Sequence, residues 1–265
     1  MNQGQRPIFL MGVSNNRDSY LLKEKRALSL LVIIPTYNES ENIEKLVHDV
    51  FAYLPKTEIL VIDDNSPDGT GRIVDGLAGA NSAVHVIHRP KKMGMGNAYN
   101  QGFRYAVEHG YDVVFEMDAD FSHKPSDLPR LLEALQENGL VIGSRYVDGG
   151  GTVNWGISRR FISKSGNLYA RIILGMDIKD ITAGFRCYSV GALKKVDLDQ
   201  VKSDGYGFQV EMAYRIKQAG YSIKEVPIIF EERRAGQSKM SKNIVTEAFI
   251  RVLMIRFKRD SALFS

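Results

Sequence analysis

The sequence predicts an α/β fold in which a mostly parallel central sheet is flanked by helices. Short, continuous apolar runs recur up to Arg145, and such runs are typical of strands buried on both faces. Stretches with apolar residues at helical spacing separate these runs, and strands that alternate with helices pair in parallel. The chain has 265 residues, of which 44% are hydrophobic and 25% charged, as in one large domain or one domain with an appendage.

Five apolar runs of the first half are predicted to be strands: residues 30–34, 59–62, 84–87, 113–117 and 140–142. The helix after the first strand carries apolar residues at helical spacing, namely Ile43, Leu46, Val47, Val50 and Phe51. Asn38 and Glu41 have the spacing of a capping box at the start of this helix. Gly94 and Gly96 indicate a tight turn that opens a later helix, and residues 128–135 have the clearest helical pattern after it.

Beyond Arg145 the pattern changes. A glycine-rich loop at 148–151 precedes a predicted helix at 158–174, an extended piece near 185–188, a helix near 208–219, a strand at 226–230 and a polar loop at 231–242. In the final helix, Glu247, Arg251 and Lys258 fall on one side, while the other side is apolar: Ile244, Ala248, Phe249, Val252 and Leu253. We therefore expect a mobile N-terminal arm (1–28), a main domain (29–242) divided near residue 145, and a C-terminal amphipathic helix (243–265).

Composition narrows the class of protein. The net charge of +4 and the pI near 9.0 suit an anionic ligand or an anionic membrane surface, and we expect no nucleic-acid binding. The single cysteine, Cys187, excludes an internal disulfide and a cysteine-built zinc site, which favours the cytoplasm. The apolar stretch at 7–13 is too short for a signal peptide, and no uncharged apolar run approaches the roughly 20 residues that cross a bilayer.

Acidic residues follow two of the predicted strands. Asp63 and Asp64 follow the second, and Asp118 and Asp120 follow the fourth. Ligands of open α/β sheets bind outside the carboxyl ends of the strands, so both acidic segments are expected to face one crevice. Neighbouring carboxylates need a cation, and the Asp-x-Asp pair offers oxygen ligands that suit Mg²⁺ or Mn²⁺, with a diphosphate supplying the remaining ligands. The alternative is a set of solvated turn residues, since the segment at 65–69 has strong turn chemistry.

An ordered series of motifs favours the metal site. The motifs are PTYNE (35–39), IDDNS (62–66), DAD (118–120), GSR (143–145), TAGFR (182–186), GYGFQVEM (205–212), EVPI (225–228) and RRAGQSK (233–239). With these motifs in this order, the sequence resembles family-two glycosyltransferases with the GT-A fold. More narrowly, it resembles dolichol-phosphate (polyprenol-phosphate) mannose synthases of the type without their own transmembrane helices. The resemblance runs from about residue 30 to about residue 242.

The resemblance implies inverting transfer of mannose from GDP-mannose to dolichyl or polyprenyl phosphate, aided by Mg²⁺ or Mn²⁺. Residues 29–145 then form the donor half of the catalytic domain and residues 146–242 the acceptor half. The guanosine part would be held by Pro35, Tyr37, Glu39, Ile62 and Asp64. The metal and the diphosphate would be held by Asp118 and Asp120 with Ala119 close to the nucleotide, and the phosphates neutralised by Arg145, Arg233 and Lys239. The expected catalytic residues are Asp118, Asp120 and Arg145.

For the acceptor, Arg159 and Ser163 lie four apart on one helix face and are expected to bind the lipid phosphate, with Arg160 as the alternative contact. Arg186 either serves the same phosphate or forms a structural ion pair. A phosphate monoester has a second pKa of about 6, so this nucleophile needs no strong base and Glu211 is given a positioning role. His123 is expected to be a surface loop residue.

A lipid acceptor implies a peripheral protein on the cytoplasmic side of a membrane. The basic C-terminal helix, with Arg251, Arg256, Lys258 and Arg259, either contacts the bilayer or packs on the core. A small membrane-protein partner is compatible with the sequence. Two other functions remain open: transfer of glucose or another sugar from a UDP-sugar to polyprenyl phosphate, and a non-catalytic subunit that binds nucleotide sugar or lipid phosphate.

Overall fold

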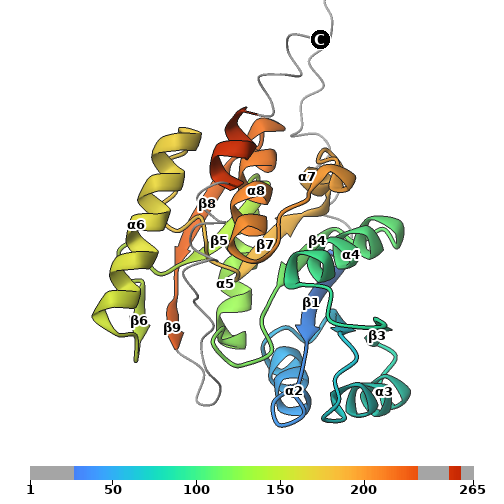
Figure 1. Cartoon of the computed structure of the whole chain (residues 1–265). Helices are drawn as coiled ribbons and strands as arrows, with labels where there is room; N and C mark the ends of the chain where they lie inside the picture. The colour runs from blue at the N-terminus through green and yellow to red at the C-terminus, as the bar shows by residue number, and fades with distance from the viewer. Residues whose placement is uncertain (1–26, 232–250, 258–265) are drawn as a thin grey trace, which may run out of the picture.

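The computed structural model describes residues 27–231 and 251–257 (Figure 1). Its main sheet has seven strands in the order β3-β2-β1-β4-β7-β5-β8, and two further strands form a small sheet of β6 and β9. The strands are β1 Leu30–Thr36, β2 Thr57–Asp63, β3 Val84–His88, β4 Val113–Glu116, β5 Leu140–Ser144, β6 Gly151–Val153, β7 Arg186–Ser189, β8 Ile223–Pro227 and β9 Ile229–Glu231. Only β7 runs antiparallel to its neighbours in this sheet, β4 and β5. The prediction of a mostly parallel sheet is confirmed.

Helices cover both faces of the main sheet (Figure 1). They are α2 Ile43–Tyr53, α3 Thr70–Ala80, α4 Met95–Glu108, α5 Leu128–Leu135, α6 Ile157–Leu174, α7 Val190–Leu193 and α8 Gly205–Gln218, with short 3-10 helices η1 Pro125–Asp127 and η2 Leu198–Gln200. Successive side chains of a strand point to opposite faces. On β1, Leu31 and Ile33 therefore join a core with α4 and α8, while Val32 and Ile34 join a second core with α2 and α5.

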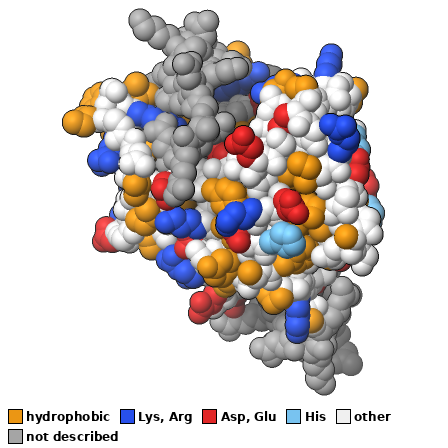
Figure 2. Space-filling model, turned by 90° about the horizontal axis from the view of Figure 1, so that it is seen from below, with side chains coloured by type: hydrophobic (Ala, Val, Ile, Leu, Met, Phe, Trp, Pro, Cys, Tyr) orange, Lys and Arg blue, Asp and Glu red, His pale blue; other side chains and the backbone are white. Residues whose placement is uncertain are grey.

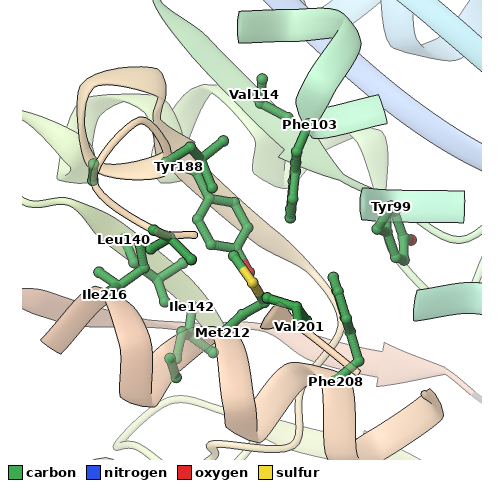
Figure 3. Close-up of a cluster of buried hydrophobic side chains, with 14 of the residues drawn as sticks. Tyr99, Phe103, Val114, Leu140, Ile142, Tyr188, Val201, Phe208, Met212 and Ile216 are labelled. Atoms are coloured by element: carbon green, nitrogen blue, oxygen red, sulfur yellow. The ribbon is translucent and has the colours of Figure 1, made fainter. Parts of the chain in front are cut away.

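The first core contains the larger aromatic side chains (Figure 3). Phe103 of α4 packs against Tyr188 of β7 at a ring-centroid distance of 5.0 Å and against Phe208 of α8 at 6.2 Å. A Cβ added at Gly102 would lie 2.5 Å from Cδ1 of Ile33, so α4 approaches β1 more closely than any larger residue would allow. These contacts hold α4 and α8 against the same strands, and the starts of both helices lie near the acidic segments described below.

Two local predictions need correction. The helix α2 begins at Ile43, after Asn42, and no side-chain cap is present at its start. Asn38 has a φ of 62° and its N–H donates to Ser66 Oγ (3.0 Å), so this segment is held by the loop after β2 rather than by a capping box. The predicted strand at 226–230 is divided: β8 pairs with β5, the chain leaves the main sheet near Ile228, and β9 pairs with β6.

Only part of the predicted C-terminal helix lies within the described residues. Residues 251–257 are helical, and Val252, on the predicted apolar side, is buried in the first core. Leu253, predicted for the same apolar side, is 39% exposed. The predicted arm up to residue 26 and the loop from residue 232 lie outside the described ranges. Within those ranges, no helix combines the length and apolar character that a bilayer span requires.

Candidate active site

The candidate site lies at the carboxyl ends of β1, β2 and β4, which are parallel neighbours and therefore end at the same edge of the sheet. Figure 2 shows this face of the molecule, on which acidic and basic side chains lie among hydrophobic ones. Asp63 at the end of β2 is buried, and its carboxylate accepts from Thr36 Oγ1 (3.0 Å) and Ser66 Oγ (2.6 Å). Asp63 thus ties the ends of β1 and β2 together.

The proposed nucleotide contacts divide into accessible and buried residues. Tyr37 is 39% exposed, with Lys92 Nζ 4.1 Å from its ring centroid, and Pro35 and Glu39 are half-buried. Ile62 is fully buried and its side chain belongs to the first core. Only the backbone of Ile62 remains for a ligand.

Asp64 holds the loop after β3. Its carboxylate accepts from Arg89 Nε and from the Met93 N–H (3.2 Å), and Arg89 Nη2 donates to the Gly94 carbonyl (3.0 Å). Both side chains of the Asp64–Arg89 pair are largely buried. Asp204, just before α8, accepts from the Gly96 N–H (2.7 Å) and so fixes the start of α4. No local pattern of residues indicates Arg89 or Asp204, because their partners lie 25 and 108 residues away.

The Asp-x-Asp segment follows β4. Tyr99 Oη donates to Asp118 Oδ1 (3.1 Å), and the Ser122 N–H donates to Asp120 Oδ1 (3.0 Å). Asp118 and Asp120 are half-buried, whereas Ala119 between them is 4% exposed. Two oriented carboxylates are hard oxygen ligands of the kind that Mg²⁺ and Mn²⁺ take, so the donor set fits the predicted metal. The described residues contain no group of three or more acidic, His or Cys side chains that could hold a metal.

His123 is part of this segment, and its prediction as a surface loop residue is wrong. It is 2% exposed, its ring stacks on Phe185 at 4.9 Å, and it meets the edge of Phe230 at 5.7 Å. The Asp118 N–H donates to His123 Nδ1 (3.1 Å). Since Nδ1 accepts, the ring carries its proton on Nε2. His123 therefore sets the backbone of the acidic turn.

A buried polar group lies beneath this turn. Glu116 accepts from Gln209 Nε2 (2.9 Å). In the antiparallel register of β4 and β7, Glu116 lies opposite Arg186. Burial raises the pKa of Glu116 to about 7, although the charge of Arg186 and the hydrogen bond from Gln209 act to lower it. Arg186 is fully buried and donates to the carbonyls of Ala183 (2.7 Å) and Ile181 (2.6 Å). This position favours the structural alternative for Arg186 over contact with a lipid phosphate.

Arg145 and the predicted acceptor residues gather around aromatic rings. Arg145 is buried and donates to Asp180 from Nε (2.7 Å), Nη2 (2.6 Å) and its backbone N–H (2.9 Å). Burial alone would lower the pKa of the Arg145 guanidinium, but the charge of Asp180 raises it above its usual value. The guanidinium carbons of Arg145 and Arg159 lie 5.2 and 4.2 Å from the Trp155 ring. Ser163 Oγ accepts from Tyr146 Oη (2.7 Å).

Phe230 joins this group to the acidic turn. Its ring contacts both His123 (5.7 Å) and Trp155 (5.4 Å), and the guanidinium of Arg145 lies 5.6 Å from its centroid. The structure thus brings Asp118, through His123, into one neighbourhood with Arg145. Neither Phe230 nor Trp155 stood out in the sequence, because isolated aromatic residues are common in cores. Arg233 and Lys239 lie outside the described residues.

Comparison with known proteins agrees with this arrangement. The family model "Glycosyl transferase family 2" matches residues 31–197. An undecaprenyl-phosphate mannosyltransferase of Micrococcus luteus is 52% identical over 225 residues, which cover 85% of this chain and 93% of the relative. A polyprenol monophosphomannose synthase of Mycolicibacterium smegmatis is 50% identical over 224 residues, 84% of each chain.

Solved structures agree on the fold. A glucosyl-3-phosphoglycerate synthase from Mycobacterium tuberculosis, solved with phosphoglyceric acid, superposes with a TM-score of 0.63 at 20% identity, covering 88% of this chain and 81% of that one. The same enzyme with Mn²⁺ and UDP-glucose gives a TM-score of 0.64 at 18% identity, covering 95% and 84%. An α/β sheet with paired carboxylates after β4 is thus the framework of a sugar-transferring enzyme of the GT-A type. The chain belongs to glycosyl transferase family 2, and the predicted resemblance to polyprenol-phosphate mannose synthases is confirmed.

Proposed function

We propose that this chain transfers mannose from GDP-mannose to dolichyl or polyprenyl monophosphate, with inversion, forming polyprenyl phosphate mannose. The observation that carries this proposal is the combination of an oriented Asp118 and Asp120 pair with two relatives at 52% and 50% identity that are named for mannose transfer to a polyprenyl phosphate. Both relatives match over more than four fifths of their own length.

On the donor side, Asp118 and Asp120 would hold Mg²⁺ or Mn²⁺, and the fold relative solved with Mn²⁺ and UDP-glucose supports a divalent ion. When bound, the metal neutralises charge on the departing diphosphate. Tyr37, whose side chain is exposed, would stack on the base, and Glu39 lies in the same strand-end segment. Pro35, the Ile62 backbone, Asp64 and Ala119 would shape the cradle around the nucleotide. Arg233 and Lys239 are proposed to neutralise the donor phosphates.

On the acceptor side, Arg159 and Ser163 are the proposed phosphate contacts. They lie on the inward side of α6, with Arg159 over Trp155 and Ser163 held by Tyr146. The phosphate is largely ionised at neutral pH, since its second pKa is about 6, so its oxygen attacks the anomeric carbon without a strong base. Arg145, held in place by Asp180, is proposed to neutralise the donor phosphates together with Arg233 and Lys239, and Arg186 serves as a buried support rather than a ligand contact.

The alternatives differ in donor or in catalysis. UDP-glucose is found with a solved relative at 18% identity, whereas the relatives at 52% and 50% identity are named for mannose transfer. A non-catalytic binding subunit would not need Tyr99 and Ser122 to orient two acidic side chains at the sheet edge. Because the proposed acceptor is a lipid, we place the chain at the cytoplasmic surface of a membrane, where a small membrane-protein partner would also fit.

The test is sugar transfer from labelled GDP-mannose, and in parallel UDP-glucose, to polyprenyl phosphate in detergent, with and without Mg²⁺ or Mn²⁺. Asp120→Asn is expected to lower turnover by orders of magnitude with an unchanged circular dichroism spectrum. Asp199→Asn is the matched control, because that carboxylate is exposed and pairs with Arg104 on the surface. Product from UDP-glucose alone would overturn the sugar, and full activity of Asp120→Asn would overturn the metal assignment. No product from either donor would leave the binding role.

A further inference from the structure

The helix α6 exposes a stripe of large apolar side chains. Ile157 is 86% exposed, Phe161 72%, Leu168 56% and Ile172 68%. Since an α-helix turns by about 100° per residue, these four positions fall within an arc of about 60°. We call them the α6 apolar stripe. Five of the 16 exposed large hydrophobic residues in the described part of the chain lie on this one helix, counting Ile162.

The opposite side of α6 is the one that packs on the protein. Its buried residues are Asn167, Ala170 and Leu174, of which Ala170 and Leu174 belong to the first core. In Figure 1, α6 stands at one side of the molecule next to β6. Arg160 Nη2 donates to the Thr152 carbonyl of β6 (3.3 Å), which joins the start of the helix to that strand. The stripe thus faces away from the core that stabilises the helix.

The charge on α6 has one sign. The helix carries Arg159, Arg160, Lys164 and Arg171, and it contains no acidic residue. By helical position, Arg160, Lys164 and Arg171 lie along one edge of the apolar stripe, and Arg171 is paired with Asp177 just after the helix. An exposed apolar stripe with a basic edge is the pattern of a helix that lies in the interface of a bilayer containing anionic lipids. A protein partner with an uncharged apolar groove would not account for Arg160 and Lys164 beside the stripe.

We propose that α6 docks the enzyme on an anionic bilayer, with the α6 apolar stripe inserted at the level of the headgroups. The proposal deepens the proposed function, because Arg159 and Ser163 lie on the inward side of the same helix. A helix with its side chains is about 10–12 Å across, so docking brings the bilayer surface within about that distance of the acceptor-binding residues. The phosphate of a membrane-embedded polyprenol then reaches the site without leaving the interface.

This surface differs from the C-terminal helix that the sequence suggested. The described part of that helix also exposes Leu253, Met254 and Phe257, but Val252 and Ile255 pack it on the first core. The C-terminal helix contributes no proposed acceptor contact. The α6 stripe is therefore the surface that couples docking to the reaction.

The experiment uses the full chain and vesicles of phosphatidylcholine, alone or mixed with phosphatidylglycerol, in a flotation assay. The test variant is the double substitution Leu168→Ser with Ile172→Ser, which leaves the proposed acceptor contacts intact. The substitutions remove two large apolar side chains from the inserted surface, so partitioning into mixed vesicles is expected to fall at least about tenfold. Tyr53→Ser is the matched control, since Tyr53 is 51% exposed on α2, and it is expected to bind as the wild type does.

Charge is tested separately. Lys164→Glu is expected to reduce the preference for vesicles that contain phosphatidylglycerol, and Lys217→Glu, an exposed change on α8, is expected to leave it unchanged. Wild-type affinity of the Leu168 and Ile172 double variant for mixed vesicles would overturn the proposal. So would a dimer in light scattering that dissociates with the same double variant, because the stripe would then bind a second copy of the chain.

Transfer assays separate docking from the proposed function. The double variant is expected to lose activity on polyprenyl phosphate embedded in vesicles while keeping wild-type activity on a short-chain, water-soluble polyprenyl phosphate. Equal activity of both proteins on the embedded acceptor would overturn docking and leave the function standing. Stripe-dependent vesicle binding by a wild-type chain that transfers no mannose to either acceptor would overturn the function and leave docking standing.

Discussion

The buried pair of Arg145 and Asp180 makes a prediction about stability. The Asp180 carboxylate receives three N–H groups of Arg145, at 2.6, 2.7 and 2.9 Å, and the side chains are 6% and 0% exposed. Asp180→Asn keeps the size of the side chain but leaves the guanidinium buried without its counter-charge. Removing one partner of a buried ion pair costs about 3–5 kcal/mol. We therefore expect the free energy of unfolding to fall by about that amount.

The same loss is measurable by heat and by denaturant. In chains of this size, 1 kcal/mol shifts Tm by about 2–4 °C, so Asp180→Asn is expected to lower Tm by about 6–20 °C and to lower the urea midpoint. Asp199→Asn breaks an ion pair with Arg104 whose side chains are 77% and 41% exposed, and we expect it to cost less than about 1 kcal/mol. The double variant Arg145→Met with Asp180→Leu is expected to cost less than the sum of its single changes. A loss below about 1 kcal/mol in Asp180→Asn would refute the reasoning.

Three further predictions concern local contacts. His123→Leu removes the acceptor of the Asp118 N–H at a cost of about 1–3 kcal/mol, and we expect this variant to need a higher metal concentration for half-maximal turnover. His123→Asn keeps an acceptor and is expected to stay closer to the wild type. Equal metal dependence of the two variants would contradict this role of His123. Gly102→Ala would place a Cβ 2.5 Å from Ile33 Cδ1, and urea denaturation is expected to show a loss of about 1–3 kcal/mol; wild-type stability would disprove the close contact. Partial burial raises the pKa of Asp68, but hydrogen bonds to its carboxylate outweigh that effect and lower the pKa to about 2. The ionised form therefore stabilises the fold above the ordinary value of 3.8, and this contribution disappears as the pH falls toward 2; Asp68→Asn is expected to lose less stability than the wild type in that window, and parallel pH profiles would refute the assignment.

The sequence predicted those parts of the fold that depend on local pattern. Continuous apolar runs gave β1 and β4, and helical spacing gave α2 and α5, with errors of a few residues at their ends. The antiparallel insertion of β7 between β4 and β5 has no local signal, because it depends on pairing between segments about 45 and 70 residues apart. The start of α2 was misplaced for a related reason: the N–H groups of residues 38–40, before the helix, donate to Ser66, Thr70 and Asp68, and acceptors so far along the chain cannot be inferred from capping spacing.

The candidate site shows the same division. Asp118 and Asp120 were predicted because they follow an apolar run, as the motifs after β1 and β2 do. Parallel neighbouring strands end at one edge of the sheet, so the sheet topology alone brings these motifs together. The residues that hold this edge were not predicted. Asp180 lies 35 residues from Arg145, and His123 turns inward only because Phe185 supplies a ring to stack on. Arg186 was predicted from its motif, but its environment was not. A sequence motif does not tell whether a guanidinium faces a ligand or the protein interior.

The position of β7 also affects how the chain acquires its structure. β4 and β5 are not hydrogen-bonded to each other, and β7, at residues 186–189, joins them. During synthesis, a nascent chain that ends near residue 145 therefore leaves three strand edges unpaired: one edge of β4 and both edges of β5, whose partners β7 and β8 lie more than forty residues further on. Such a topology has high contact order, which slows folding and prolongs the exposure of those edges to other chains. A fragment made of the first half alone is thus expected to aggregate rather than fold, and the candidate site becomes complete only after β7 and the start of α8 have been synthesised.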